Sequence, residues 1–280
     1  MKDSLHTILT CPKCRHAVEF SKPIQCVSCK LSFSNAEDGT PMMLLDHEIV
    51  RTDKEASPSK FRNFLRSLVP SGRFPGINIG LDIEDAIEKL LSEKPDAVIV
   101  NVGSGESNLH SKVVNLDIYN NDAVDLVADA HFIPLLDNSV DGVLCESIME
   151  HVRQPTMIAK EFERILKPGG YVYIVAPFIF PYHESPIDCY RYTTTGLSEL
   201  FPNCEVLEQG YLKGPASAYA RISAAFLAVL FSFNNPWLYR IIHPVARVLL
   251  HPLSFLDYVL KGSRYSNLIG SGTFIWAKGR

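Results

Sequence analysis

Several features that mark other classes of protein are absent from this sequence. Its longest apolar run, about a dozen residues before Asn234, is short of the roughly 20 that span a bilayer. Residues 1–6 have no long apolar stretch and no small-residue cleavage site, so we expect no secretory signal and a cytoplasmic protein. The 27 Lys and Arg against 31 Asp and Glu give a net charge of −4, which argues against a nucleic-acid partner.

Cysteine is sparse, but four of the seven cysteines form a pattern. Two C-x2-C pairs lie eleven residues apart, which is the spacing of a zinc ribbon. Four thiolates bind one tetrahedral ion at about 2.3 Å and leave no open position for water, so the metal would be structural. Two disulfides or a metal-free pair of turns are the alternatives, and disulfides are disfavoured in a reducing cytosol. The expected Zn²⁺ ligands are Cys11, Cys14, Cys26 and Cys29.

An apolar strand followed by two glycines indicates a nucleotide pocket. Residues 97–100 are largely β-branched, as in a strand buried on both faces of a parallel sheet. Gly103 and Gly105 follow, and they permit a tight turn in which a ligand can approach bare backbone. A second strand over 113–116 ends in Asp117, whose carboxylate can accept hydrogen bonds from two ribose hydroxyls.

The same alternation continues along the chain. We expect further strands over 125–130, 139–146 and 171–176, each ending at a loop that faces one edge of the sheet. A helix over 85–93 precedes the first strand, and Pro95 ends it.

At this point residues 96–201 resemble the class I S-adenosylmethionine-dependent methyltransferases, in particular the type 11 branch. The most specific segments are 101–105, 116–118, 128–130, 150–152 and 166–170. The resemblance implies a Rossmann-like three-layer α/β/α sheet in which the glycine loop holds the methionine part of the cofactor. It also implies S-adenosylmethionine as cofactor and a set of cofactor-binding residues: Asn101, Gly103, Ser104, Gly105, Asp117, Ile118, Asp129, Ala130 and Glu146.

Two departures from the family pattern bear on activity. Asn101 stands where the family often has an acid, and the interval from Gly103 to Asp117 is short, so the helix after the glycine loop must be brief or irregular. Both departures support an alternative function, a non-catalytic scaffold. In favour of the enzyme, residues 5–45 resemble the small zinc ribbons of the methyltransferase-activator family, which are partners or fused companions of methyltransferases.

Two loops contain candidate groups for the reaction. We expect His151, after the fourth strand, and His183 and Asp188, after the fifth, to be catalytic because a base must lie at this edge of the sheet. Tyr182, Tyr190 and Arg191 are expected to bind the acceptor. The alternatives are that His151 only orders its loop, and that Arg191 pairs with Asp188 or Glu184. The second loop is also similar to one in bacterial methyltransferases encoded among cell-surface polysaccharide genes, which suggests a sugar or lipid-linked glycan acceptor.

The region 214–260 is apolar and predicted to be helical, either covering the substrate crevice or seated reversibly on the inner face of a membrane. We expect five segments, listed here in order: a zinc ribbon over 1–47, a linker and short helix over 48–75, the methyltransferase core over 76–212, a helical insertion over 213–262, and the last strand within 263–280. The leading function is methyl transfer to a small polar, sugar or lipid-linked acceptor, and RNA methylation is the alternative within enzymes. The oligomeric state is not predicted.

Overall fold

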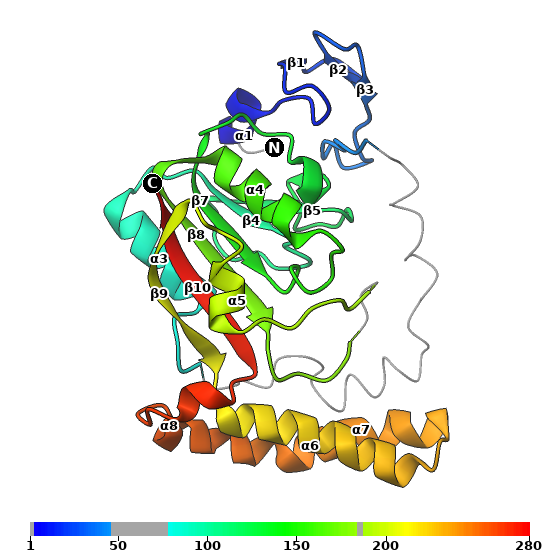
Figure 1. Cartoon of the computed structure of the whole chain (residues 1–280). Helices are drawn as coiled ribbons and strands as arrows, with labels where there is room; N and C mark the ends of the chain where they lie inside the picture. Colours follow the sequence, from blue (N-terminus) through cyan, green and yellow to red (C-terminus); the bar gives the residue numbers. More distant parts are fainter. Residues whose placement is uncertain (1–2, 46–77, 184–186) are drawn as a thin grey trace.

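The structure is a computed structural model that describes residues 3–45, 78–183 and 187–280. The linker over 48–75, its predicted short helix and Glu184 lie outside these ranges. A small ribbon, a central α/β domain and a helical hairpin are arranged from one end of the molecule to the other (Figure 1). The fold class expected from the sequence is confirmed.

A seven-stranded sheet forms the centre of the molecule, in the order β6-β5-β4-β7-β8-β10-β9. Strands β4 to β8 pair in parallel, and β10 is antiparallel to both of its neighbours. The last strand predicted within 263–280 is β10. The strands are β4 Ile99–Val102, β5 Val113–Asp117, β6 Leu126–Val127, β7 Val140–Glu146, β8 Leu166–Pro177, β9 Cys204–Lys213 and β10 Gly272–Gly279.

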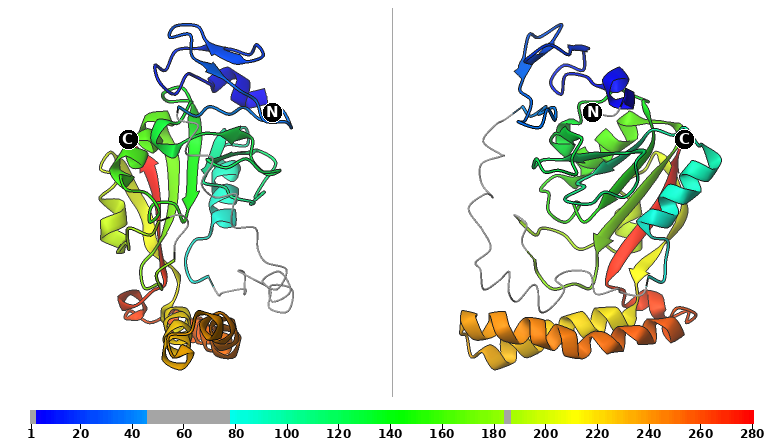
Figure 2. Two further views of the ribbon diagram at one scale, coloured as in Figure 1. Left: turned by 90° about the vertical axis from the view of Figure 1, so that its right-hand side faces the viewer. Right: turned by 180° about the vertical axis from the view of Figure 1, so that it is seen from behind.

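Helices cover both faces of this sheet and complete the three layers (Figure 2). Helix α3 (Ile83–Glu93) buries Ala86, Ile87 and Leu90 in one core cluster, and its N-terminus is capped by Asp82. Helix α4 (Pro155–Ile165) belongs to the other cluster, on the opposite face. A short helix, α5 (Thr194–Ser198), follows and is capped by Thr193, as its sequence predicts.

The structure corrects some element boundaries. The first strand begins at Ile99, not Ala97, and the predicted strand over 125–130 is two residues long and continues into a 3-10 helix, η2 (Ala130–Phe132). Residues 103–112 contain no helix, which confirms that the segment after the glycine loop is irregular.

The ribbon consists of α1 (Asp3–Ile8), β1 (Val18–Glu19), β2 (Ile24–Cys26) and β3 (Ser32–Phe33). It is bonded to the edge of the large sheet, because Met43 N–H donates to the Val127 carbonyl (2.8 Å) and Val127 N–H donates to Pro41 (2.9 Å). Arg15 adds a bidentate ion pair to Glu161 of α4, with both N–O distances 2.9 Å. Ribbon and sheet share one hydrophobic core, so the ribbon is part of the folded domain.

A helical hairpin lies across the opposite end of the domain, beyond the ends of β8, β9 and β10 (Figures 1 and 2). It comprises α6 (Pro215–Ser232), α7 (Pro236–Leu250), η3 (His251–Leu256) and α8 (Asp257–Leu260), and η4 (Ser266–Leu268) leads back to β10. Asp257 is fully buried and accepts hydrogen bonds from the N–H groups of Ala216 and Ser217, so it caps the start of α6.

Candidate active site

The glycine loop after β4 adopts the backbone conformation that its sequence predicts. Gly103 and Gly105 have φ values of 73° and 53°, in the left-handed region that favours glycine. The two glycines differ in their surroundings. A Cβ on Gly103 would lie 1.6 Å from Ile148 Cδ1, whereas nothing lies within 4 Å of a Cβ on Gly105. The bare backbone open to a ligand is therefore at Gly105, and Gly103 makes room for the loop that follows β7.

Asp117 and Ser104 provide polar atoms beside this loop. The Asp117 carboxylate accepts from the N–H groups of Gly105 (2.8 Å) and Tyr119 (2.9 Å), which fixes its orientation at the end of β5. Ser104 is buried, and its hydroxyl has no hydrogen-bond partner among the residues that the structure describes. A buried hydroxyl without a partner is unfavourable, so this atom fits a polar group of a bound cofactor. The loop thus fits S-adenosylmethionine.

The other predicted cofactor residues lie at the same edge of the sheet, with different contacts. Asp129 accepts from the backbone and the ring Nδ1 of His131 (2.9 and 2.7 Å). Burial opposes its ionisation, but these bonds outweigh burial and keep the pKa of Asp129 below its ordinary value. Asn101 is buried and donates to Asn115 (3.3 Å), so its amide joins two strands.

Three further residues of the predicted set lie in separate elements. Ile118 packs against the small cluster that joins the ribbon to β6. Ala130 begins η2, and Glu146 ends β7. Ser147 follows with a φ of 58°, a strained conformation for a residue with a side chain, and this turn directs the chain toward Ile148 and the glycine loop.

On the acceptor side, the structure brings His151 and His183 together around Glu150. Their Nε2 atoms lie 3.7 and 3.8 Å from the same Glu150 carboxylate oxygen, and the two rings meet edge to face with centroids 4.8 Å apart. Burial and the neighbouring His151 lower the pKa of His183 below its ordinary value, so its imidazole is neutral near pH 7. Burial raises the pKa of Glu150.

Glu150 is a candidate site residue that the sequence did not predict. Its side chain is 1% exposed, and one carboxylate oxygen, Oε2, has no hydrogen-bond partner among the described residues. The signal available in the sequence was an acid next to His151 directly after a predicted strand. Burial of that acid depends on the long-range approach of His183, which local sequence does not reveal.

Asp188 and Arg191 form an ion pair that braces the loop after β8. Arg191 binds both carboxylate oxygens of Asp188 and also donates to the carbonyls of Phe180, Pro181 and Tyr190. Arg191 holds the pKa of Asp188 well below its ordinary value, so this carboxylate is a weak base. Asp188 also accepts from His183 N–H (2.7 Å). The pair therefore positions His183. Arg191 pairs with Asp188 as in the structural alternative, whereas a catalytic role of Asp188 and an acceptor contact of Arg191 remain predictions.

The two predicted acceptor-binding tyrosines lie on the outside of this loop. Tyr182 is 69% exposed, and Tyr190 donates to the Arg153 carbonyl (3.2 Å). Both remain predictions as contacts for the acceptor.

The four ribbon cysteines converge as their spacing predicts. Their sulfur atoms all lie within 4.8 Å of one another, with Cys14 and Cys26 3.4 Å apart. Hydrogen bonding from the His16 backbone lowers the pKa of Cys14 to about 6, whereas burial raises that of Cys11 to about 12. The cluster fits one structural Zn²⁺ with four thiolate ligands. Cys145 and Cys204 are buried, and Cys189 is exposed.

Comparison with known proteins agrees with this geometry. Residues 100–174, from β4 into β8, match the family model described as a methyltransferase domain. The match confirms the expected enzyme, an S-adenosylmethionine-dependent methyltransferase. No curated protein matches the sequence.

Solved structures with a similar fold include a chain from the complex of the Haloferax volcanii Trm112 methyltransferase activator with a methyltransferase. It has 16% identity and a TM-score of 0.40, and the alignment covers 69% of this chain and 87% of that chain. The phosphoethanolamine N-methyltransferase 2 of Haemonchus contortus with S-adenosyl-L-methionine has 16% identity and a TM-score of 0.46, with 78% of this chain and 57% of that chain covered. A Thermotoga maritima S-adenosylmethionine-dependent methyltransferase has 16% identity and a TM-score of 0.43, with 70% and 87% covered.

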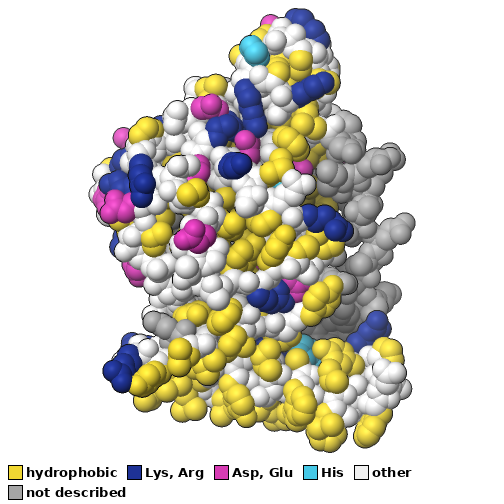
Figure 3. Space-filling view, viewed as in Figure 1, with side chains coloured by type: hydrophobic (Ala, Val, Ile, Leu, Met, Phe, Trp, Pro, Cys, Tyr) yellow, Lys and Arg dark blue, Asp and Glu magenta, His cyan; other side chains and the backbone are white. Residues whose placement is uncertain are grey.

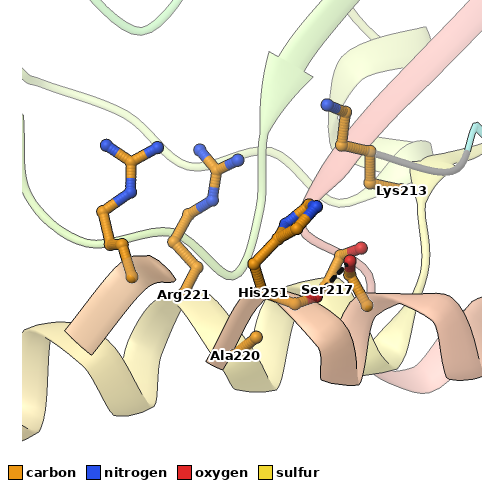
Figure 4. A pocket seen from close by; sticks show the side chains of 7 residues that line it. Lys213, Ser217, Ala220, Arg221 and His251 are labelled. Atoms are coloured by element: carbon orange, nitrogen blue, oxygen red, sulfur yellow. Dashed lines mark hydrogen bonds between the residues drawn. The ribbon is translucent and has the colours of Figure 1, made fainter. Parts of the chain in front are cut away.

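A basic pocket lies between the hairpin and the methyltransferase domain (Figure 4). Arg221 stacks on Phe180, 4.4 Å from the ring centre, and Phe180 in turn packs against His183, with ring centroids 4.7 Å apart. Burial and the neighbouring Arg247 lower the pKa of Arg221 to about 10. The pocket is thus connected through one aromatic ring to the candidate base. Its lining residues are Lys213, Ser217, Ala220, Arg221, Arg247, His251 and Ser254.

Proposed function

We propose that this methyltransferase methylates a hydroxyl group of a phosphate-bearing acceptor that is anchored in a membrane by a lipid. The observation that carries the proposal is the apolar outer face of the α6–α7 hairpin, which lies below the active-site edge of the sheet (Figures 1 and 3).

The outer face of the hairpin is unusually apolar for a surface. Apolar side chains gather along α6 and α7 (Figure 3), and Phe226, Val229 and Phe233 are 62, 65 and 81% exposed. Leu249 and Val259 extend the same surface with 72 and 78%. Exposed apolar surface of this extent marks a site of contact with a protein or a membrane. We take the occupant to be lipid, because a basic pocket suited to a phosphate group lies directly behind this surface.

Helix α6 is also the one described helix that is long and apolar enough to cross a membrane, with a mean hydropathy of 1.3 over 18 residues. Its small residues favour an arrangement parallel to the membrane plane. Ala216, Ala220, Ala224 and Ala228 recur every four residues, and all are buried against the rest of the protein. Only the opposite face of α6 is available to lipid, as in an amphipathic helix that lies in the membrane–water interface.

The basic pocket gives this arrangement a polar recognition element. Arg221 and His251 project from the helices on the side of the methyltransferase domain (Figure 4). Lys213, Arg221 and Arg247 line this pocket, and cationic side chains of this kind suit a phosphate group. A phosphate held here would place the sugar attached to it next to Phe180 and His183.

In the reaction, bound S-adenosylmethionine supplies an electrophilic methyl group on a sulfonium centre. The acceptor oxygen forms the new C–O bond as the C–S bond breaks with its electron pair going to sulfur, and the hydroxyl proton passes to His183 Nε2. Neutral His183 is suited to accept this proton, and the nearby Asp188 carboxylate favours the imidazolium that forms. Asp188, paired with Arg191, fixes the position of His183. Alignment of the acceptor supplies roughly 7–11 kcal/mol of the barrier reduction.

The test measures transfer of a radiolabelled methyl group to a polyprenyl-phosphate-linked monosaccharide in phosphatidylglycerol vesicles, with the free sugar phosphate as comparison. We expect labelling of the lipid-linked acceptor and at least tenfold less of the free sugar phosphate. Co-sedimentation with vesicles should be lost in the double variant Phe226→Ser and Val229→Ser. The matched control is Leu207→Ser, since Leu207 is 48% exposed on β9. Equal labelling of both acceptors, or equal sedimentation of all variants, would overturn the membrane part of the proposal.

A further inference from the structure

We propose that Glu150, His151 and His183 bind a divalent transition-metal ion at the acceptor side of the crevice. The three residues each offer one ligand atom, and these atoms all lie within 4.8 Å of one another. This site is separate from the four cysteines of the ribbon, and it contains a set of ligands of a different chemical type.

The distances suit a common ion. Ligands bonded to one ion at about 2.0–2.2 Å lie about 3–3.5 Å from each other in tetrahedral or octahedral geometry. The two imidazole Nε2 atoms are 3.7 and 3.8 Å from Glu150 Oε1. Small side-chain rotations, within the reach of the half-exposed His183, would bring the three atoms to bonding positions.

The second nitrogen of the His151 ring is oriented as in known metal sites. His151 Nδ1 lies 2.5 Å from the Ile187 carbonyl oxygen. A carbonyl can only accept, so Nδ1 carries the hydrogen and Nε2 has a lone pair for the ion. A partner of this type fixes the tautomer and direction of a ligating histidine. His183 Nδ1 lies 3.4 Å from the Asp188 carboxylate and makes no hydrogen bond to a described residue.

The burial of Glu150 supports a bound ion separately from the distances between the ligand atoms. Its carboxylate is almost fully buried at 1% exposure, and its Oε2 has no hydrogen-bond partner among the described residues. Buried carboxylates are normally paired or coordinate metals. The other oxygen, Oε1, faces the two imidazoles, and a cation bound there would neutralise the buried carboxylate.

The ligand types indicate the class of ion. Two imidazoles and one carboxylate favour first-row transition metals such as Mn²⁺, Fe²⁺, Co²⁺ or Zn²⁺ over Ca²⁺ and Mg²⁺, which prefer oxygen. Three protein ligands leave positions open for water or an acceptor oxygen. An acceptor hydroxyl bound there would have a lowered pKa and would release its proton to solvent, because ligated imidazoles no longer act as bases. This role rests on the proposed function, whereas binding of the ion does not.

The experiment titrates the full-length, zinc-loaded protein with Mn²⁺ and follows free Mn²⁺ by electron paramagnetic resonance. Mn²⁺ prefers oxygen and imidazole ligands to thiolates, so it leaves the ribbon cluster unchanged. We expect one saturable site, with affinity reduced at least tenfold in Glu150→Gln and in His183→Ala. Glu199→Gln and His6→Ala are matched controls, because both side chains are exposed and remote from the site, and they should bind as the parent protein does.

The titration is repeated with Co²⁺, and the visible absorption spectrum is recorded. We expect weak bands typical of Co²⁺ bound by nitrogen and oxygen ligands. Retained S-adenosylmethionine binding in each variant shows that it is folded. The proposal is overturned if neither Mn²⁺ nor Co²⁺ binds at millimolar concentration, or if Glu150→Gln binds them as tightly as the parent. If no metal binds, loss of methyl transfer in His183→Ala would still support His183 as the general base of the proposed reaction. Metal binding without any transfer to lipid-linked acceptors would overturn only the proposed function.

Discussion

Ile148 lies directly over the α-carbon of Gly103, so the loop after β7 and the glycine loop after β4 are packed against each other. This contact connects the cofactor side of the crevice with the segment that leads to Glu150 and His151. Gly103 is required for this packing, whereas no protein atom would lie within 4 Å of a Cβ on Gly105.

The contact predicts different effects for alanine at the two glycines. Gly103→Ala combines a positive φ with a methyl group 1.6 Å from Ile148, so it should displace the loop, lower stability and weaken S-adenosylmethionine binding at least tenfold. Gly105→Ala has only the backbone strain, about 1 kcal/mol. Thermal unfolding and calorimetry of both variants check this. A larger loss of stability in Gly105→Ala would contradict the packing role of Gly103.

The order of strands, the glycine loop and the ribbon could be predicted because each has a local signature: an apolar run, a positive-φ glycine or a pair of cysteines. The cluster of Glu150, His151 and His183 could not be predicted in the same detail. Glu150 and His183 have 32 residues between them in the sequence, and their approach depends on how the loop after β8 folds back. The basic pocket was missed for the same reason, because Lys213, Arg221 and Arg247 come from three elements.

Asp117 should be essential for cofactor affinity. Asp117→Ala removes the acceptor of the Gly105 N–H and the carboxylate expected to bind the ribose, so the affinity for S-adenosylmethionine should fall at least tenfold. Isothermal calorimetry on zinc-loaded protein measures it. Asp137→Ala is the control, since Asp137 is exposed and pairs with Arg164 away from the crevice. Unchanged affinity in Asp117→Ala would contradict the assignment of the pocket.

The pKa of His183 predicts how activity depends on pH. Burial and His151 lower this pKa, so the neutral imidazole persists below the ordinary value of about 6.5. The protonated ring can neither accept a proton nor bind an ion, and kcat/KM should fall as pH decreases, with a midpoint below pH 6.5. Glu150, Asp188 and Arg191 face the same ring and contribute to the profile. In His183→Gln the residual activity should lack this acidic limb, and an unchanged limb would assign it to another group.

Replacement of Arg191 should affect the acceptor more than the cofactor. Arg191→Lys keeps the charge but loses the bidentate bond to Asp188 and most of the bonds to three carbonyls, so His183 is no longer held. We expect kcat to fall at least tenfold while S-adenosylmethionine affinity is unchanged. Steady-state kinetics with calorimetry separate the two effects. Activity equal to that of the parent protein would show that the brace is dispensable.

The ribbon should stabilise the methyltransferase domain through Glu161. This side chain is 12% exposed and accepts from Arg15 of the ribbon, from Arg164 and from the Ile133 N–H. Glu161→Gln removes the carboxylate that joins Arg15 to Arg164, which keeps only the exposed Asp137, and we expect a loss of about 3 kcal/mol in the free energy of unfolding. Lys89→Ala, which removes an exposed ion pair with Glu208, should cost less than about 1 kcal/mol. Chemical denaturation measures both losses.

Removal of Zn²⁺ by a chelator should also lower the free energy of unfolding of the domain, because the ribbon and the sheet share a core. A domain whose unfolding is unaffected by the chelator would show that the ribbon is only attached to the sheet and does not support it.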